Sequence, residues 1–301
     1  MGVHQLPAFF HCQTNMLLIA DSGSTKTDWR LVDEAGQSQA SLITEGLNPY
    51  FLPKEKITEV IRERILPLID EIDKVFFYGA GCGSAVKADQ VKDVLDATLN
   101  ARYPAEVSGD ILGAARSLLQ DENGIACILG TGANSCLYDG RDIVGIQPSL
   151  GYMFSDWGSG TVMCKDLIAL LLQEKLPAPM LNDFKATYNL ERSEILDHIY
   201  NQPLPNRFLA SFTPFLLKYA DVPECEKIIL ENLKKFFGYY VCAYPRPDTA
   251  AKLSFTGSIA YRFRNYLTRV SEELGFDIEH IVQHPMDGLV KYHCVTVPIG
   301  N

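Results

Sequence analysis

The chain has 301 residues, of which 47% are hydrophobic and 21% charged, which is typical of a globular protein and excludes a disordered or fibrous one. A formal net charge of −10 argues against a broad nucleic-acid footprint. The eight cysteines are scattered without a C-x-x-C pair, and no apolar run reaches the length of a membrane span, so we expect a reduced cytoplasmic protein.

The start of the chain differs in composition from the rest. The first fifteen residues contain one short apolar patch, Leu6 to Phe10, but no Lys or Arg and no small-residue cleavage site, so we do not expect a secretory signal. Met16 to Ala20 is an apolar run ended by a turn cluster, which is typical of a buried strand. We expect the fold to begin at Met16. The role of the tail from Cys294 to Asn301 is left open.

Strands and helices alternate along the first half of the chain. After the strand at 16–20, we expect strands at 28–31, 38–44, 74–78 and 105–108, and helices at 53–66, at 85–99 and from Asp110 onward. A run of small and polar turn residues, Asp21 to Thr27, separates the first two strands. The helix at 53–66 is expected because Pro53 opens it and apolar residues recur on one face.

The same pattern restarts at Ile125. An apolar strand at 125–129, a glycine turn at 130–134 and a returning strand at 135–138 come first; helices near 157–173, 191–200, 205–219 and 223–243 follow, then a strand at 252–255, a Gly257-Ser258 turn, a helix at 259–274, a strand at 278–282 and a short helix at 285–292. Interleaved strands and helices predict an α/β fold, and the restart predicts two similar halves around a cleft.

The turn after the first strand has the residues of a phosphate site. Gly23 lets the backbone approach a ligand, and the N–H groups and hydroxyls of Ser22, Ser24 and Thr25 can donate to phosphate oxygens. Asp21, at the strand end, is suited to holding Mg²⁺ through water. Lys26 could also contact phosphate, although an exposed lysine at a strand edge is at least as common.

A second turn, Gly130-Thr131-Gly132, offers the same groups from the other half. Either turn alone could be a plain hairpin, because Gly, Ser, Asn and Asp are ordinary turn residues. The occurrence of both, each after an apolar strand in a repeated half, favours a pair that clamps the β- and γ-phosphates of ATP. A third glycine run, Tyr78 to Ser84, matches a dinucleotide fingerprint only weakly, and we expect its Gly81 to line the cleft and contact substrate.

Four segments together resemble one known family. Asp21–Thr27, Leu129–Ser135, Gly151–Ser159 and Thr256–Ala260 are similar, in this order, to the motifs of the N-acetylglucosamine kinase and BadF/BadG ATPase family, a branch of the actin, hexokinase and Hsp70 fold group. The resemblance covers roughly Met16 to His293. It implies two ribonuclease-H-like, actin-like ATPase domains around a central cleft, with ATP and Mg²⁺ bound there and Gly257 and Ser258 beside the adenosine.

We place the limits of these domains near the restart of the pattern. The N-terminal domain is expected to comprise residues 16–115, joined by the C-terminal helix at 285–293. The C-terminal domain is expected to comprise residues 116–284 and to carry a helical insertion.

Sugar phosphorylation requires a base near the attacking hydroxyl. Asp110 precedes a helix of small residues; this place is typical of an N-cap, and in the sugar kinases that this chain resembles an Asp here is the catalytic base. Asp156 is the rival, since it also stands before a helix, and the family's Asp at this point binds the sugar. Ser155 and Trp157 replace the family's Gly and Glu there, which leaves the sugar identity open. Asn48 is either a partner for sugar hydroxyls or part of an Asn-Pro turn.

The preferred function is ATP-dependent phosphorylation of an amino sugar, N-acetylglucosamine to its 6-phosphate or a related reaction, with Asp110 as base. The alternatives are a BadF-type ATPase activator of an iron–sulfur enzyme, which needs clustered cysteines, and a non-catalytic sugar sensor. Tyr239 and Tyr240 fit a core face better than a base-stacking platform. The expected partners are the sugar and ATP, with no nucleic acid and no membrane, and a homodimer is left open.

Overall fold

The computed structural model describes residues 15–244 and 252–296. The first strand begins at Met16, as expected. The expectations about residues 1–14 and about the end of the tail, 297–301, lie outside the described residues.

The first lobe is built on a five-stranded sheet within the described chain. Its strands, in spatial order, are β3 (Ser38–Glu45), β2 (Lys26–Asp33), β1 (Met16–Ser22), β4 (Lys74–Gly79) and β5 (Glu106–Gly109). β1, β2 and β3 are antiparallel neighbours, whereas β1, β4 and β5 run parallel. The carboxyl ends of these three parallel strands therefore meet at one edge of the sheet.

The second sheet of the described chain has the same design. Its order is β10 (Ile278–Val282), β9 (Lys252–Thr256), β6 (Asn123–Leu129), β7 (Ala133–Asp139) and β8 (Ile143–Ile146), with β6, β7 and β8 antiparallel and β6, β9 and β10 parallel. β6 thus corresponds to β1, and the prediction of two similar α/β halves is confirmed. The sequence analysis missed β8 because it is a four-residue edge strand whose side chains are all partly or fully exposed.

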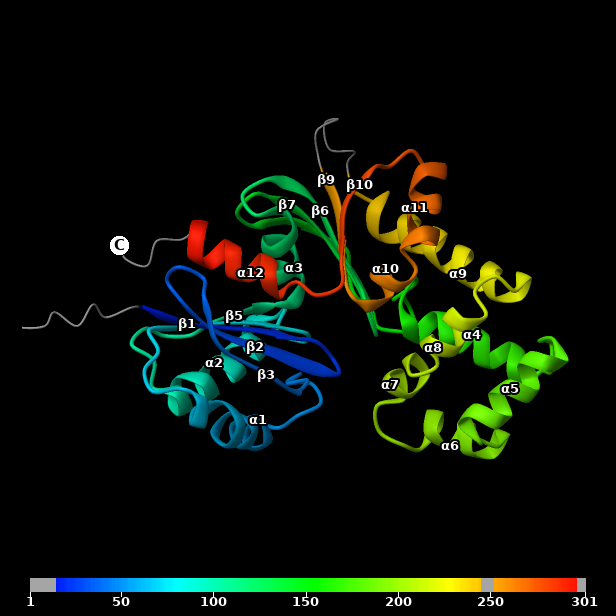
Figure 1. Ribbon diagram of the computed structural model, residues 1–301, viewed down its shortest axis with the longest axis horizontal. Coiled ribbons are helices and arrows are strands. Elements are labelled where there is room, and N and C mark those ends of the chain that lie inside the picture. The colour runs from blue at the N-terminus through cyan, green and yellow to red at the C-terminus, as the bar shows by residue number, and fades with distance from the viewer. Residues whose placement is uncertain (1–14, 245–251, 297–301) are drawn as a thin grey trace, which may run out of the picture.

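Helices cover the outer faces of the sheets (Figure 1). The first lobe has α1 (Lys54–Val60), which continues through a π-helical turn (Ile61–Ile65) and a short 3₁₀ turn (Leu66–Leu68), and α2 (Ala85–Leu99). The second lobe has α4 (Gly160–Leu172), α5 (Ala178–Tyr188), α6 (Arg192–Tyr200), α7 (Pro205–Ala210), α8 (Thr213–Lys218), α9 (Pro223–Phe236) with a π-helical turn (Phe237–Val241), α10 (Ser258–Arg262) and α11 (Arg264–Glu273).

These helices differ from the expected ones at three places. The expected helix at 205–219 is divided into α7 and α8, because Pro214 has no N–H and takes a place in the first turn of a new helix. The expected helix at 259–274 is likewise divided at Phe263. Helix α5 was missed, since prolines stand at its N-cap and in its first turn and its buried residues are few.

Two helices lie between the sheets. α3 (Asp110–Leu119) packs Ile111, Ala114 and Ala115 against the second sheet, and α12 (Met286–Lys291), followed by a π-helical turn (Tyr292–Thr296), packs Met286 and Leu289 against the first. Both are drawn side by side at the centre of Figure 1. The domain limits stay a prediction, and we propose that the chain divides within α3.

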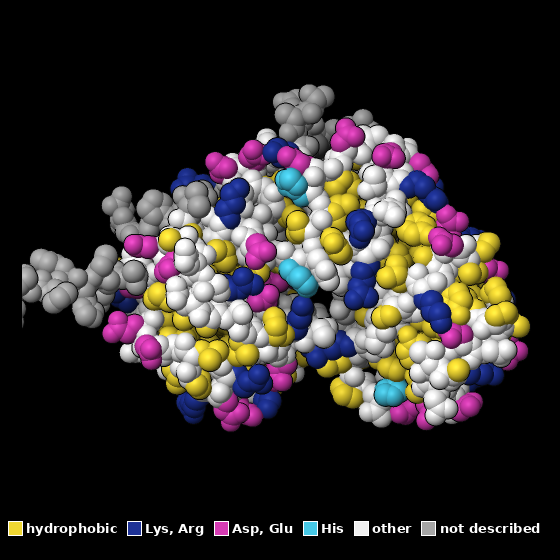
Figure 2. Space-filling model, viewed as in Figure 1, with side chains coloured by type: hydrophobic (Ala, Val, Ile, Leu, Met, Phe, Trp, Pro, Cys, Tyr) yellow, Lys and Arg dark blue, Asp and Glu magenta, His cyan; other side chains and the backbone are white. Residues whose placement is uncertain are grey.

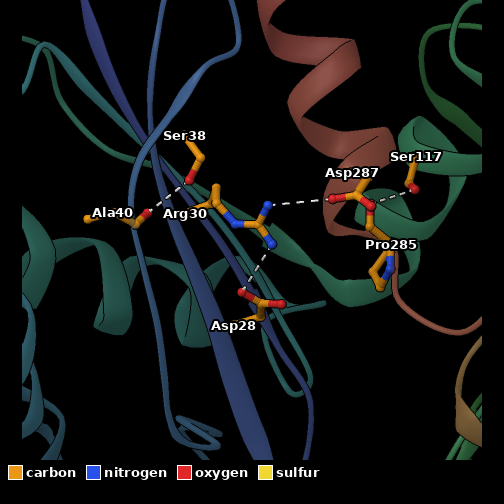
Figure 3. Close-up of polar contacts among 7 residues, drawn as sticks. All are labelled: Asp28, Arg30, Ser38, Ala40, Ser117, Pro285 and Asp287. Atoms are coloured by element: carbon orange, nitrogen blue, oxygen red, sulfur yellow. Dashed lines mark hydrogen bonds and ion pairs between the residues drawn. The ribbon is translucent and has the colours of Figure 1, made fainter.

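The crossing of α3 and α12 is close. A side chain at Gly288 would begin 2.3 Å from Ser117 Oγ and 2.4 Å from the Ser117 carbonyl oxygen. The Ser117 hydroxyl donates to the Pro285 carbonyl oxygen at 2.7 Å, and Arg30 of β2 reaches Asp287 at 3.5 Å, as Figure 3 shows. The two helices are therefore in close backbone contact with each other, and α12 is also attached to the first sheet.

Replacing Gly288 with Ala should force these helices apart and destabilise the protein by about 1–3 kcal/mol, as overpacking of tight contacts does. Gly238→Ala is the matched control, since a side chain there would meet nothing within 4 Å. Thermal unfolding of both variants tests this. Equal midpoints for the two would contradict the close crossing.

Candidate active site

A cleft of about 900 Å³ lies between the lobes. Figure 2 shows the surface hollowed where the lobes meet. Each lobe contributes turns and helix ends to the wall of the cleft, and the residues that line it are Asp21, Gly23–Lys26, Asp28, Asn48, Tyr50, Ala80, Gly81, Gly83, Ser84, Gly109–Ile111, Ala114, Ile128, Gly130–Asn134, Ile146, Ser149, Asp156, Thr256–Ser258 and Gln283–Pro285. With one exception, Ser22, every candidate site residue from the sequence analysis is among them.

Ser22 has a different place. Its side chain is fully buried, and its hydroxyl accepts the Leu47 N–H at 3.0 Å and lies 2.8 Å from the Thr27 hydroxyl. The Thr27 hydroxyl in turn donates to the Glu45 carbonyl oxygen at 2.9 Å. Ser22 and Thr27 therefore attach the end of β3 to the first glycine turn, which sets the position of Asn48.

The two glycine turns meet across the cleft. In the first, Gly23 N–H donates to the Lys26 carbonyl oxygen at 2.9 Å, and in the second, Gly130 N–H donates to the Gly132 carbonyl oxygen at 2.9 Å. The hydroxyls of Thr25 and Thr131, 106 residues apart in sequence, are 3.5 Å apart. The turns are therefore arranged as a facing pair, one from each lobe.

The second turn is supported from behind by the start of α4. Gly160 N–H donates to the Gly130 carbonyl oxygen at 2.9 Å, and the Thr161 hydroxyl donates to the Thr131 carbonyl oxygen at 2.6 Å. With these carbonyl oxygens bound and the Gly130 N–H used within the turn, the Thr131 and Gly132 N–H groups and the Thr131 hydroxyl remain to donate to an anion.

Four carboxyl groups in the cleft, those of Asp21, Asp28, Asp110 and Asp156, have raised pKa values. The pKa of Asp21 is raised to about 7, first by burial and then by the negative charges of Asp110 and Asp28. Burial raises the pKa of Asp110 to about 6, although the N–H groups of Ile111 and of Asp110 itself stabilise its ionised form. The N-cap of α3 is Gly109, and Asp110 is the first residue of the helix. Asp110 therefore stands at the N-terminal end of the helix, which favours negative charge.

Asp156 is held in a conformation that few residues adopt. Its φ is 55°, its side chain is 8% exposed, and its Oδ1 has no partner within the described chain. Burial raises its pKa to about 6, opposed by hydrogen bonds from the Ala133 N–H and the Ser155 hydroxyl and helped by the charge of Asp110. Backbone strain and an unpaired buried oxygen are both typical of a functional residue.

Asn48 and Gly81 form one unit on the opposite wall. Asn48 is 7% exposed, and its Oδ1 accepts the Tyr50 N–H at 2.9 Å. Gly81 has φ +87°, and a Cβ there would lie 2.3 Å from Asn48 Oδ1. Only glycine fits against the amide at this point, and the Asn48 amide nitrogen remains to donate into the cleft.

Gly257 and Ser258 lie at the start of α10, where the Gly257 N–H donates to the Val282 carbonyl oxygen at 3.1 Å. The neighbouring Thr256 also lines the cleft, and its buried hydroxyl has no partner among the described residues. Sequence reasoning missed Thr256, together with Asp28, Tyr50, Ile146, Ser149 and His284. Thr256 begins one of the four motif segments but was not singled out, and the others lie outside those segments or carry no signal of their own, because folding brings them together from separate strands and loops.

The side chains of the cleft are suited to a hard divalent cation that phosphate oxygens and water help to hold. Among the described residues, they do not form a site in which several protein side chains bind a metal ion. Within residues 15–244 and 252–296 there is no group of three or more His, Cys, Asp or Glu side chains that could hold a metal ion. The ionised form of Asp21 is disfavoured by burial and by its acidic neighbours Asp110 and Asp28, and a cation would reverse that effect. Mg²⁺ bound by one or two carboxylates, phosphate oxygens and water matches this arrangement.

The described cysteines are separate from the cleft chemistry. Cys82, Cys127, Cys136, Cys164 and Cys225 are buried and free, and burial raises the pKa of each thiol. No helix among the described residues has both the length and the apolar character needed to cross a membrane.

The raised pKa of Asp21 has a consequence for stability. A carboxyl group whose pKa is higher in the folded state than in the unfolded state stabilises the fold when protonated, and this contribution is lost as the pH rises from about 4 to about 7. Asp21→Asn should therefore raise the thermal midpoint of the ligand-free protein above pH 7, by about 2–4 °C for each kcal/mol of relieved strain. The gain should shrink toward pH 4.

Asp139→Asn is the control for this prediction, because backbone N–H groups lower the pKa of the exposed Asp139 and its ionised form is not penalised by burial. Thermal unfolding between pH 4.5 and 8 measures both variants. A lower midpoint for Asp21→Asn at pH 8 would overturn the inferred strain.

Comparison with solved structures identifies relatives along almost the whole chain. A candidate N-acetylglucosamine kinase from Porphyromonas gingivalis is 41% identical, with a TM-score of 0.88, over 93% of this chain and 99% of that one. Another from Chromobacterium violaceum is 14% identical (TM-score 0.69; 93% and 99% covered), and a ROK family glucokinase from Streptomyces griseus, solved with glucose and AMPPNP, is 13% identical (TM-score 0.58; 92% and 98% covered). These two show the fold alone.

A scan against models of protein families and a search of curated proteins found no match. The identity of 41% over nearly the full length of both chains is sufficient by itself to assign this chain to a family. The chain belongs to the N-acetylglucosamine kinase family, whose members have the two-domain actin-like fold of sugar kinases.

Proposed function

We propose that this protein transfers the γ-phosphate of ATP to the 6-hydroxyl of N-acetylglucosamine or a closely related amino sugar, with Asp110 as the general base. The observation that carries the proposal is the position of Asp110: a partly buried carboxylate at the start of a helix, in the same cleft as two facing glycine turns. The Porphyromonas gingivalis protein, which is 41% identical to this chain, is described as a candidate N-acetylglucosamine kinase, which supports the same substrate class.

The nucleotide half of the site consists of backbone groups and hydroxyls. The two glycine turns supply N–H groups and the Thr25 and Thr131 hydroxyls to the β- and γ-phosphates, and Lys26 adds a positive charge at the cleft wall. Thr256, Gly257 and Ser258 would contact the nucleoside. Mg²⁺, when bound next to Asp21, would neutralise charge on the transferred phosphate.

The sugar half lies between Asn48 and Asp156. The Asn48 amide can donate to a sugar oxygen, and the unpaired Oδ1 of Asp156 can accept from a hydroxyl, so the two together fit a polyhydroxy ring. The backbone at Gly81 comes close to the same space. Sugar placed here would present a hydroxyl to Asp110, which takes the proton as the oxygen attacks phosphorus.

Asp110→Asn should lower the rate of sugar-dependent ADP release by roughly 100- to 10,000-fold, because the amide cannot accept the proton. KM for ATP should change little, since Asp110 is not part of either glycine turn. A coupled ADP-release assay across amino sugars and plain hexoses provides the measurement.

Two results, one on ATP turnover and one on sugar binding, would overturn the proposal. ATP turnover that does not depend on any sugar would indicate an ATPase. Sugar binding without turnover, unchanged in the Asp110→Asn variant, would indicate a sensor.

The pH dependence distinguishes the two candidate bases. Since burial raises the pKa of Asp110 to about 6 and the base must be ionised, kcat/KM should be constant above pH 7 and fall about tenfold per pH unit below pH 6. Asp156→Asn should bind sugar less well but keep this acidic limb. Loss of the limb in Asp156→Asn, with its retention in residual Asp110→Asn activity, would make Asp156 the base.

A further inference from the structure

The loop that carries Asp156 has an unusual attachment. Residues 147–159 connect β8 with α4, and this segment supplies Ser149 and Asp156 to the cleft. Its middle is exposed: Leu150 is 53%, Met153 67% and Phe154 73% accessible. With so little apolar burial, other contacts must determine how the two cleft residues are placed.

Three tyrosines provide those contacts, all from the end of α9 and just beyond it. The Tyr239 hydroxyl donates to the Pro148 carbonyl oxygen at 3.2 Å. The Tyr240 hydroxyl accepts the Asp156 N–H at 3.3 Å, and the Tyr244 hydroxyl accepts the Gln147 N–H at 3.2 Å. The beginning of the loop is thus held at two points, and its end at the residue that faces the cleft.

The Tyr244 hydroxyl is oriented by a buried hydrogen-bond chain. The Ser135 hydroxyl donates to the Tyr240 carbonyl oxygen at 2.7 Å, so its only proton is used there. The Tyr244 hydroxyl lies 2.8 Å from the Ser135 hydroxyl oxygen and must then donate to it. This leaves a lone pair of the Tyr244 oxygen for the Gln147 N–H. Ser135 lies on β7, so the chain connects the loop to the second sheet.

The helix adopts a special geometry to make these contacts. α9 widens into a π-helical turn at Phe237–Val241, where the Cys242 N–H bonds to the Phe237 carbonyl oxygen five residues earlier. Single π-turns of this kind are frequent at functional sites. The aromatic rings alone would be satisfied by phenylalanine, as in Phe236, whose ring stacks on Tyr240. Packing alone therefore does not explain why these positions have tyrosine hydroxyls.

We propose that Tyr239, Tyr240 and Tyr244 are positioning residues for the sugar half of the site. Their hydroxyls fix both ends of loop 147–156, so that Ser149 and Asp156 point into the cleft before sugar binds. The proposal rests on the proposed function for its sugar readout, but the attachment of the loop can also be measured without any ligand.

The kinetic test uses Tyr240→Phe and the double variant Tyr239→Phe/Tyr240→Phe, which keep the rings and remove the hydroxyls. KM for sugar should rise about two- to tenfold per hydroxyl, while KM for ATP stays unchanged. Tyr266→Phe is the matched control: its hydroxyl donates to Asp221 at 3.0 Å in the same lobe, and neither residue lines the cleft. The control should leave both KM values at those of the wild type.

The ligand-free test uses Trp157, which follows Asp156 directly and packs edge-on against the Tyr239 ring at 5.1 Å. The chain has one other tryptophan, Trp29, which is 2% exposed and poorly accessible to a quencher. Acrylamide quenching should therefore report on Trp157, and it should increase in the double variant but not in Tyr266→Phe.

The possible results separate this inference from the proposed function. Unchanged quenching in the double variant would overturn the inference, as would a sugar KM equal to that of the wild type. A parallel rise in both KM values, with a thermal midpoint far below that of the control, would indicate general destabilisation and overturn it too. If the wild-type protein phosphorylates no sugar, the proposed function fails, and increased quenching would still support the attachment.

Discussion

Four acidic side chains, Asp21, Asp28, Asp110 and Asp156, share one cleft, and the surrounding fold must accommodate their repulsion. Ionised Asp21, Asp110 and Asp156 are each disfavoured by burial, and Asp110 raises the pKa of both of the others. Such a group of acids is costly in the ligand-free protein, so the surrounding fold must supply the stability that keeps it together. Its cost falls when a cation and hydroxyl donors enter the cleft.

Two repeated sheets bring the acids together. Asp21 is the last residue but one of β1, Asp110 follows β5, and the second turn follows β6, so the carboxyl ends of strands from both lobes converge on the cleft. The contact between α3 and α12 keeps this convergence in place, because Ser117 and Gly288 allow the helices to touch at the backbone. Asp110 is therefore both the proposed base and the first residue of a helix that lies between the lobes.

The second lobe differs from the first mainly through its helical insertion, α4 to α9. This insertion gives the lobe its large core, and its last turn carries the tyrosines that hold the loop at 147–156. The same helices thus stabilise the lobe and shape the site. The start of α4 supports the second glycine turn, and the π-helical turn after α9 supports Asp156, so one set of helices stabilises both proposed halves of the site.

Much of this protein could be predicted from local sequence, because strand and glycine-turn signals depend on neighbouring residues. The repeated unit of strand and glycine turn, first at β1 and again at β6, can be recognised in the chain itself, as can the α/β class and the polar residues Asp21, Asp110 and Asn48. Elements without a strong periodic signal, such as β8 and α5, were not. The sequence by itself determined which chemical groups are available. Only the tertiary structure decided which of them share the cleft, that Ser22 turns inward to hold β3, and that Tyr239, Tyr240 and Tyr244 bond to one loop, because each of these contacts joins residues far apart in sequence and forms only when the sheets and the insertion pack.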